Sequence, residues 1–92
     1  MNLLTDEEIA AQLGGVPSWQ RHGDSIVLTV TRSDFRDALL YVGAVAYLAE
    51  TANHHPDVAI SWNKVTLTLS THSAGGLTGA DFALAGQISR LG

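Results

Sequence analysis

Hydrophobic and polar positions alternate with a period of two in several parts of the chain, which predicts β-strands. Residues 25–31 and 65–70 carry an apolar side chain at every second position, as in a strand with one face on a core. Residues 58–62 form a further apolar run, which an Asn-Lys turn at 63–64 joins to the next strand. Residues 16–22 predict a fourth strand, paired with the strand that follows it across a Gly-Asp turn.

Two short helices are predicted near the ends of the chain, over residues 5–13 and 78–91. Each begins with a capping box. A threonine, Thr5 or Thr78, accepts a hydrogen bond from the amide three residues later, and the acidic side chain there reaches back. In the second box the acidic residue is Asp81. Because capping explains a carboxylate at this position fully, we favour a structural role for Asp81 over a catalytic one.

A longer helix is predicted over residues 34–52, begun by Ser33 or Asp34. Its apolar residues form two adjacent stripes at helical spacing, which together are wider than one sheet face requires. The helix is therefore expected to be buried on two sides, the second against another helix or a second subunit. The stripes are Phe35, Leu39, Val42, Ala46 and Ala49, and Ala38, Tyr41, Val45, Leu48 and Ala52.

The order of the predicted elements is helix, two strands, long helix, two strands, helix. Strands that occur in pairs predict an antiparallel sheet, with the helices packed on one face, in the α+β class. A chain of 92 residues is enough for one domain of this kind, spanning residues 1–92.

Composition and charge exclude several classes of function. The net charge is −4 and the five basic residues are scattered, which argues against nucleic acid as a partner. The absence of cysteine excludes disulfides, a thiolate nucleophile and a cysteine-based zinc site, and a cytoplasmic location is expected.

The first residues lack the pattern of a signal peptide, and no apolar run is long enough to cross a membrane. Charged residues make up 15%, against a usual ~25%, which favours an oligomer that hides surface between subunits.

Three of the four histidines occur in the second half of the chain. His54 and His55 follow the long helix, which must end near Asn53 because Pro56 disfavours helical backbone before it. His72 follows the last strand, away from the core face, and the hairpin brings it back towards the other two. Imidazoles exchange protons near neutral pH. These three residues, the histidine rim, are therefore a candidate site for general acid–base catalysis.

Alternative chemistries need further groups around the rim. Glu50 lies four residues before His54, so a persisting last turn would let the carboxylate hold the imidazole in one tautomer. If the last turn does not persist in this way, the two residues form an exposed ion pair that contributes little to stability. A metal site is not predicted, because adjacent histidines on an extended chain point apart and another ligand would have to come from Glu50 or Asp57. Ser70 and Ser73 lack the turn motif of a serine nucleophile.

An ordered set of motifs surrounds the histidine rim. It consists of Asn53-His54-His55-Pro56, Trp62, Asn63-Lys64-Val65, Thr71-His72, Gly75-Gly76-Leu77-Thr78 and Asp81. This set resembles the pterin-4a-carbinolamine dehydratase family, over roughly residues 30–90. The resemblance implies four antiparallel strands backed by three helices. It also implies dehydration of a 4a-hydroxy-tetrahydropterin to the quinonoid dihydropterin, in tetrahydrobiopterin recycling, with no metal or organic cofactor.

The resemblance also assigns roles to individual residues. His54 and His72 would be acids that reach the departing hydroxyl, and His55 would hold the pterin ring or act as the base. Glu50 and Asp81 would support these groups. Trp62 would be a wall of the site or, more often, a packing residue. The residues expected to bind the pterin substrate are His54, His55, Pro56, Thr71, His72, Ser73 and Ala74.

The resemblance bears on protein partners too. Family members associate as dimers or tetramers, which favours a homodimer or homotetramer through residues 35–52. Some members double as dimerisation factors for transcription regulators, and related proteins assist the assembly of other enzymes. The alternative function is therefore a non-catalytic dimerisation or assembly module that uses the same fold. Retention of all three histidines of the rim favours the enzyme.

Overall fold

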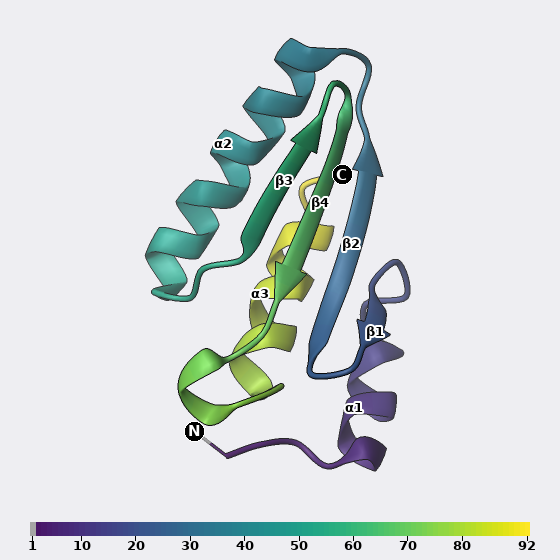
Figure 1. Cartoon of the computed structure of the whole chain (residues 1–92), viewed down its shortest axis with the longest axis vertical. Coiled ribbons are helices and arrows are strands. Elements are labelled where there is room, and N and C mark those ends of the chain that lie inside the picture. Colours follow the sequence, from purple (N-terminus) through teal and green to yellow (C-terminus); the bar gives the residue numbers. More distant parts are fainter. Residues whose placement is uncertain (1) are drawn as a thin grey trace.

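The computed structural model describes residues 2–92, and the first residue of the predicted domain lies outside this range. The elements are, in order, α1 (Asp6–Leu13), β1 (Gln20–His22), β2 (Ser25–Thr31), α2 (Phe35–Ala52), β3 (Asp57–Ser61), β4 (Lys64–Leu69), the one-turn 3₁₀-helix η1 (His72–Ala74) and α3 (Gly79–Ser89). The strands form one antiparallel sheet in the order β1-β2-β4-β3 (Figure 1). The predicted α+β class is confirmed, with three α-helices and a four-stranded antiparallel sheet within residues 2–92. Among residues 2–92, no helix combines the length and the apolar composition needed to cross a membrane.

One face of the sheet carries the hydrophobic core. The alternation in β4 places Val65, Leu67 and Leu69 on this face, where each is fully buried. Ile26 and Leu28 of β2 lie opposite Leu69 and Leu67 and extend the same surface. Helices α2 and α3 belong to this core, and α2 runs along the β3 side of the sheet (Figure 1). Burial of one such side chain contributes about 1.5–3 kcal/mol, so the predicted alternation identifies much of what holds the sheet to its helices.

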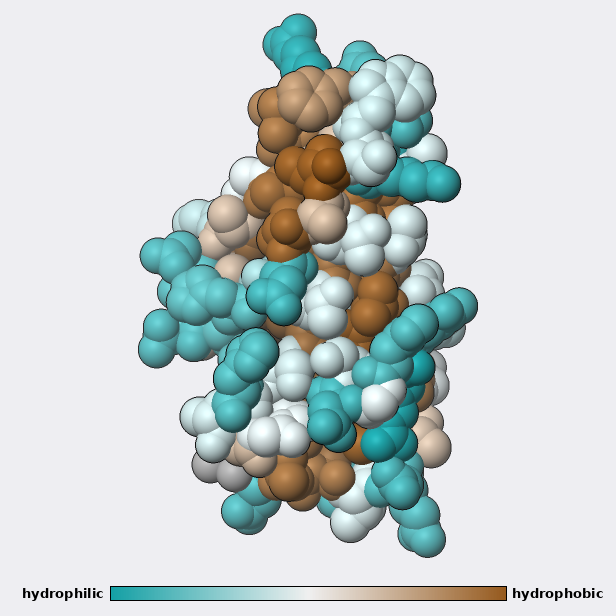
Figure 2. Space-filling view, viewed as in Figure 1, coloured by the Kyte–Doolittle hydropathy of each residue, from teal (hydrophilic) through white to brown (hydrophobic). Residues whose placement is uncertain are grey.

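Within the chain, helix α2 is buried on one side only. Ala38, Tyr41, Val45 and Ala49 face the core. Figure 2 shows hydrophobic surface gathered towards the end of the molecule where α2 begins. The second covered side that the two stripes predict is therefore not supplied by residues 2–92 of one chain. Four large apolar residues of α2 are exposed in the single chain and define what we call the exposed side of α2: Phe35, Leu39, Leu40 and Tyr47.

The first strand is shorter than predicted. It begins at Gln20 rather than at residue 16, and the chain forms turns before it. Trp19 points inward and is buried, and its indole N–H donates a hydrogen bond to Ser89 Oγ at 3.1 Å. The residues before Trp19 form turns and do not pair with β2, whose pairing with β1 starts at Gln20.

The turn between β3 and β4 lies one residue earlier than predicted. It comprises Trp62 and Asn63, so Lys64 already belongs to β4, where it pairs with Ser61 and Thr31. Trp62 adopts a left-handed backbone conformation with φ 51°. This conformation, which is uncommon for a large residue, carries the chain through the turn.

Asn53 ends α2 in the left-handed conformation, with φ 50° and ψ 43°. Its backbone N–H donates to the carbonyls of Ala49 and Glu50, and the N–H of His54 also donates to the carbonyl of Ala49. These bonds satisfy the last carbonyls of the helix. They also turn the chain away from the helix axis at Asn53, so His54 leaves α2 in a new direction.

We expect Asn53→Ala to lower the free energy of unfolding by about 1–2 kcal/mol, because alanine has a Cβ but no side chain that offsets the left-handed conformation. Asn53→Gly is the matched control, since glycine adopts positive φ without this steric cost. Urea denaturation followed by circular dichroism measures both variants. An equal loss of stability in the two would contradict the argument, because it would assign the effect to the side-chain amide.

Candidate active site

The β3–β4 hairpin brings the histidine rim together. His54 and His55 precede β3 and His72 follows β4, and the pairing of Asp57 with Thr68 places these two ends of the hairpin side by side. The three imidazoles line one open hollow of about 250 Å³, as the hairpin predicts. The other residues that line this histidine hollow are Asn53, Ser70, Thr71 and Ser73.

A buried carboxylate holds His54. Nε2 of His54 lies 2.5 Å from Oδ1 of Asp81, whose side chain is 0% exposed. Asp81 stands in the first turn of α3, and its Oδ2 accepts the backbone N–H of Thr78 at 2.9 Å as half of the capping box. The predicted capping role is confirmed, and the same carboxylate also reaches the imidazole. Capping and support of a histidine are therefore not alternatives for Asp81.

The second oxygen of Asp81 belongs to a buried hydroxyl network. Oγ1 of Thr71 donates to Asp81 Oδ2 at 2.8 Å and lies 2.8 Å from Oγ1 of Thr78. Both threonines are buried. Thr71 lines the histidine hollow, yet its hydroxyl is engaged with Asp81 and Thr78. From the sequence, Thr71 was expected only to bind the pterin and Thr78 only to cap α3, so this network was not predicted.

The predicted pairing of Glu50 with His54 is wrong. Oε2 of Glu50 lies 2.5 Å from Nε2 of His55 instead. The reason is the left-handed backbone of Asn53, which ends the helix before His54 and removes the four-residue spacing on one face. Both partners of the observed pair are exposed, with 56% of the His55 side chain and 76% of the Glu50 side chain accessible. Each of the two neighbouring histidines therefore has its own carboxylate.

His72 is the first residue of η1, three residues beyond the end of β4. It is exposed, which confirms the predicted position away from the core face. It lines the histidine hollow, and among residues 2–92 the ion pairs between histidines and carboxylates involve His54 and His55 rather than His72.

The remaining predicted residues occupy different places. Ser73 lines the histidine hollow, whereas Pro56 lines a neighbouring apolar hollow of about 290 Å³ between α2 and β3. Ala74 lies in η1 and lines neither. Trp62 is at the far end of the hairpin and is 66% exposed, so within one chain it is neither a wall of the site nor a packing residue. The apolar hollow also contacts Glu50 and His55.

The described part of the chain contains no group of three or more acidic or histidine side chains arranged to hold a metal ion. Instead, Nε2 of His54 lies within hydrogen-bonding distance of Asp81, and Nε2 of His55 lies within hydrogen-bonding distance of Glu50. These histidines and carboxylates therefore form two hydrogen-bonded pairs, an arrangement that suits proton transfer.

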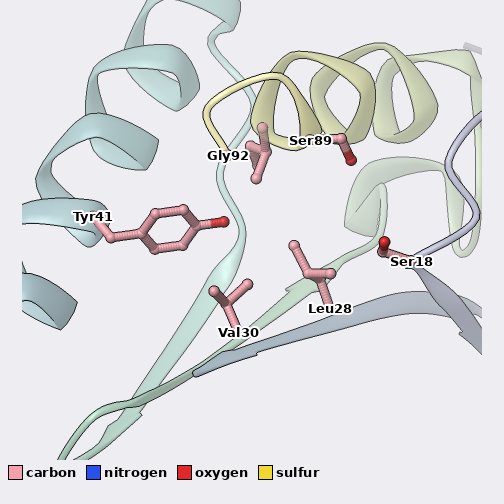
Figure 3. A pocket seen from close by; sticks show the side chains of 7 residues that line it. Ser18, Leu28, Val30, Tyr41, Ser89 and Gly92 are labelled. Carbon is pink, nitrogen blue, oxygen red and sulfur yellow. The ribbon is translucent and has the colours of Figure 1, made fainter. Parts of the chain in front are cut away.

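A separate cavity of about 200 Å³ lies away from the histidines, between β2, α2 and the end of α3 (Figure 3). The hydroxyl of Tyr41 points into it, and Leu28 and Val30 form its floor (Figure 3). Burial raises the pKa of the Tyr41 phenol, while the nearby Arg32 guanidinium, 4.9 Å from the ring centre, acts in the opposite direction. Among residues 2–92, the side chains that line this cavity include no histidine and no acidic side chain.

The chain matches the family model described as pterin 4 alpha carbinolamine dehydratase over residues 2–91. It belongs to the pterin-4a-carbinolamine dehydratase family. A relative from Roseiflexus castenholzii, itself named only provisionally as such a dehydratase, is 53% identical over 97% of this chain and 96% of its own length. A relative from Nocardia farcinica with the same provisional name is 55% identical over 97% of this chain and 94% of its own.

Two solved structures show the same architecture as this pterin-4a-carbinolamine dehydratase family member. The crystal structure of a transcriptional coactivator/pterin dehydratase from Brucella melitensis has a TM-score of 0.93 and 30% identity, over 98% of each chain. A pterin dehydratase-like protein identified as a RuBisCO assembly factor in the alpha-carboxysome has a TM-score of 0.68 over 80% of this chain and 88% of its own. Its identity is 22%, so this second likeness concerns the fold alone.

We expect Asp81→Asn to lower the free energy of unfolding by about 1–3 kcal/mol, because the amide has one acceptor oxygen for three donors, two of them buried. Glu50→Gln makes the same chemical change in the exposed pair and should leave stability unchanged within error, since exposed ion pairs contribute little. Urea denaturation of both variants measures the difference. Wild-type stability in Asp81→Asn would show that the buried network does not hold the fold.

Proposed function

We propose that the protein is a 4a-hydroxytetrahydrobiopterin dehydratase, which converts the pterin-4a-carbinolamine to quinonoid dihydropterin and water by histidine acid–base catalysis. The observation that carries the proposal is the histidine hollow, in which three imidazoles meet and two of them are held through Nε2 by carboxylates. Membership of the family supports the substrate class. The resulting role is tetrahydrobiopterin recycling.

The reaction requires two proton movements and no change of oxidation state. One proton is delivered to the departing 4a-hydroxyl, the C4a–O bond breaks and water leaves. The proton on N5 is removed, and its bonding pair forms the C4a–N5 double bond of the quinonoid product. Groups that exchange protons near neutral pH suffice for both movements, and no metal or organic cofactor is required.

We propose a division of these roles among the histidines that follows the resemblance to the family. His54 and His72 are the proposed acids, which reach the 4a-hydroxyl from different sides of the hollow. His55 is proposed to hold the ring or to accept the N5 proton. Because the carboxylates engage Nε2 of His54 and of His55, Nδ1 is the ring nitrogen of each that remains for the substrate. The turn that contains Ser73 and Ala74 is proposed to line the bound pterin, together with Pro56.

We further propose a homodimer or homotetramer that packs through α2. The support is the exposed side of α2, where Phe35, Leu39, Leu40 and Tyr47 are all accessible in the single chain. Scattered exposed apolar residues are ordinary, but several on one helix are typical of an interaction surface. The low fraction of charged residues, 15%, is consistent with such an interface.

The second candidate function is a non-catalytic dimerisation or assembly module. The same exposed side of α2 favours it, since that surface could bind a different protein. The Brucella melitensis relative is described as a transcriptional coactivator as well as a pterin dehydratase. Saturable binding of a dihydropterin distinguishes the two, because a module with an idle site should show none.

We expect the protein to accelerate the decay of 4a-hydroxy-tetrahydropterin at neutral pH, followed by ultraviolet absorbance against the uncatalysed reaction. His55→Ala should fold, because His55 is exposed, and should lose most of this activity. Replacement of His54, His55 and His72 together by alanine should abolish it. His22→Ala removes a histidine outside the hollow and is the matched control. Wild-type turnover in His55→Ala would exclude the three-histidine mechanism.

Light scattering at micromolar concentration should give the mass of a dimer or tetramer. Leu39→Glu places a charge on the exposed side of α2 and should shift the mass towards the monomer. Ala10→Glu adds the same charge at an exposed position of α1 and should not. A wild-type monomer would contradict assembly through α2.

A further inference from the structure

We propose that Thr71 is a positioning residue for both His54 and His72, and that it acts through a directed chain of buried hydrogen bonds without contacting the reacting atoms. The inference rests on the dehydratase function proposed above and adds a determinant of its geometry. Its basis is the position of Thr71, which lies between Asp81 and Thr78 on one side and the turn of His72 on the other.

The direction of the hydrogen-bond chain follows from its donors. An ionised carboxylate only accepts, and each threonine hydroxyl has one proton. Thr71 therefore donates its proton to Oδ2 of Asp81, and Thr78 donates its own to Thr71. The backbone N–H of Thr78 is a second donor to Oδ2. Oδ1 of Asp81 is left to accept from Nε2 of His54.

This direction fixes the tautomer of His54. With the proton on Nε2 pointing at Asp81, Nδ1 is the nitrogen that exchanges a proton in the histidine hollow. The hydroxyl of Thr71 restrains the carboxylate plane, because it and the backbone N–H of Thr78 hold Oδ2 from two directions. Removal of that hydroxyl leaves the carboxylate freer to rotate, and with it the imidazole.

The backbone of Thr71 holds the other acid. Its N–H donates to the carbonyl of Gly76, and its carbonyl accepts the N–H groups of residues 74–76. These bonds close η1, the turn in which His72 is the first residue. A single buried residue therefore ties the turn that carries His72 to the carboxylate that holds His54.

Two variants separate the hydroxyl of Thr71 from its packing. Thr71→Val keeps the shape and removes the donor, whereas Thr71→Ser keeps the hydroxyl and removes a methyl group. For dehydration we expect Thr71→Val to lower kcat roughly tenfold with KM nearly unchanged, which corresponds to one lost hydrogen bond to a charged group. Thr71→Ser should retain the wild-type kcat. The reverse order of the two variants would assign Thr71 a packing role and overturn the proposal.

A spectroscopic measurement tests the same point without substrate. Long-range ¹⁵N NMR spectra of the imidazoles, recorded at a pH where His54 is neutral, distinguish the Nε2–H from the Nδ1–H tautomer. We expect His54 to be the Nε2–H tautomer in the wild type and in Thr71→Ser, and a mixture in Thr71→Val. His72→Ala should lose activity but leave the His54 signals unchanged. An unaltered tautomer in Thr71→Val, or Nδ1–H in the wild type, would overturn the proposal.

The two proposals fail in different ways. A wild type without dehydratase activity would overturn the proposed function, while the tautomer of His54 would still test the positioning role. An active wild type with unchanged kcat in Thr71→Val would overturn the positioning role alone. If Thr71→Val does not fold, a measurement on the wild-type protein tests the proposal instead. The Thr71 hydroxyl proton should then give a resolved, slowly exchanging resonance, and rapid exchange with solvent would overturn the proposal.

Discussion

The buried carboxylate of Asp81 is the interaction on which both the fold and the histidine rim depend. A buried charge is stable only where hydrogen-bond donors surround it. Its donors come from the start of α3, from Thr71 after β4 and from His54 after α2. The same bonds therefore join three segments that are distant in sequence and orient an imidazole. Because one group does both, we expect a substitution of Asp81 to change the stability of this region and the geometry of the site together.

Alternation and capping could be predicted from the sequence because both are local. The period of two in β4 identified the buried face, and the box of Thr78 and Asp81 identified the start of α3. The parity that places His72 away from the core also places Thr71 on the core side, where it is buried. A polar residue at a core position needs a buried partner, so this was an available signal for the network. The partners themselves could not be predicted, because His54 and Asp81 meet only through the packing of the folded chain.

Two of the sequence-based predictions failed where one residue adopts a left-handed backbone. The expected pairing of Glu50 with His54 assumed that the last helical turn continued, and Asn53 ends it one residue too early. The expected hairpin turn was displaced by one residue because Trp62, not a small residue, takes positive φ. Such conformations are set by the surrounding structure rather than by local preference, since they cost energy for most residues. The conformation of Asn53 has the larger consequence, because it leaves Glu50 beside His55 rather than His54.

The two carboxylate–histidine pairs differ in environment and therefore in behaviour. The pair of His54 and Asp81 is shielded from solvent and held on several sides, whereas the pair of His55 and Glu50 is exposed, screened by salt and free to separate. The site thus combines one restrained imidazole with one that is free to move, which suits the proposed elimination, because that reaction must deliver one proton and remove another. Glu50 and His55 also line the apolar hollow beside α2. If the proposed second subunit packs on that hollow, it would restrict the exposed pair, and the proposed assembly through α2 would then affect the proposed role of His55.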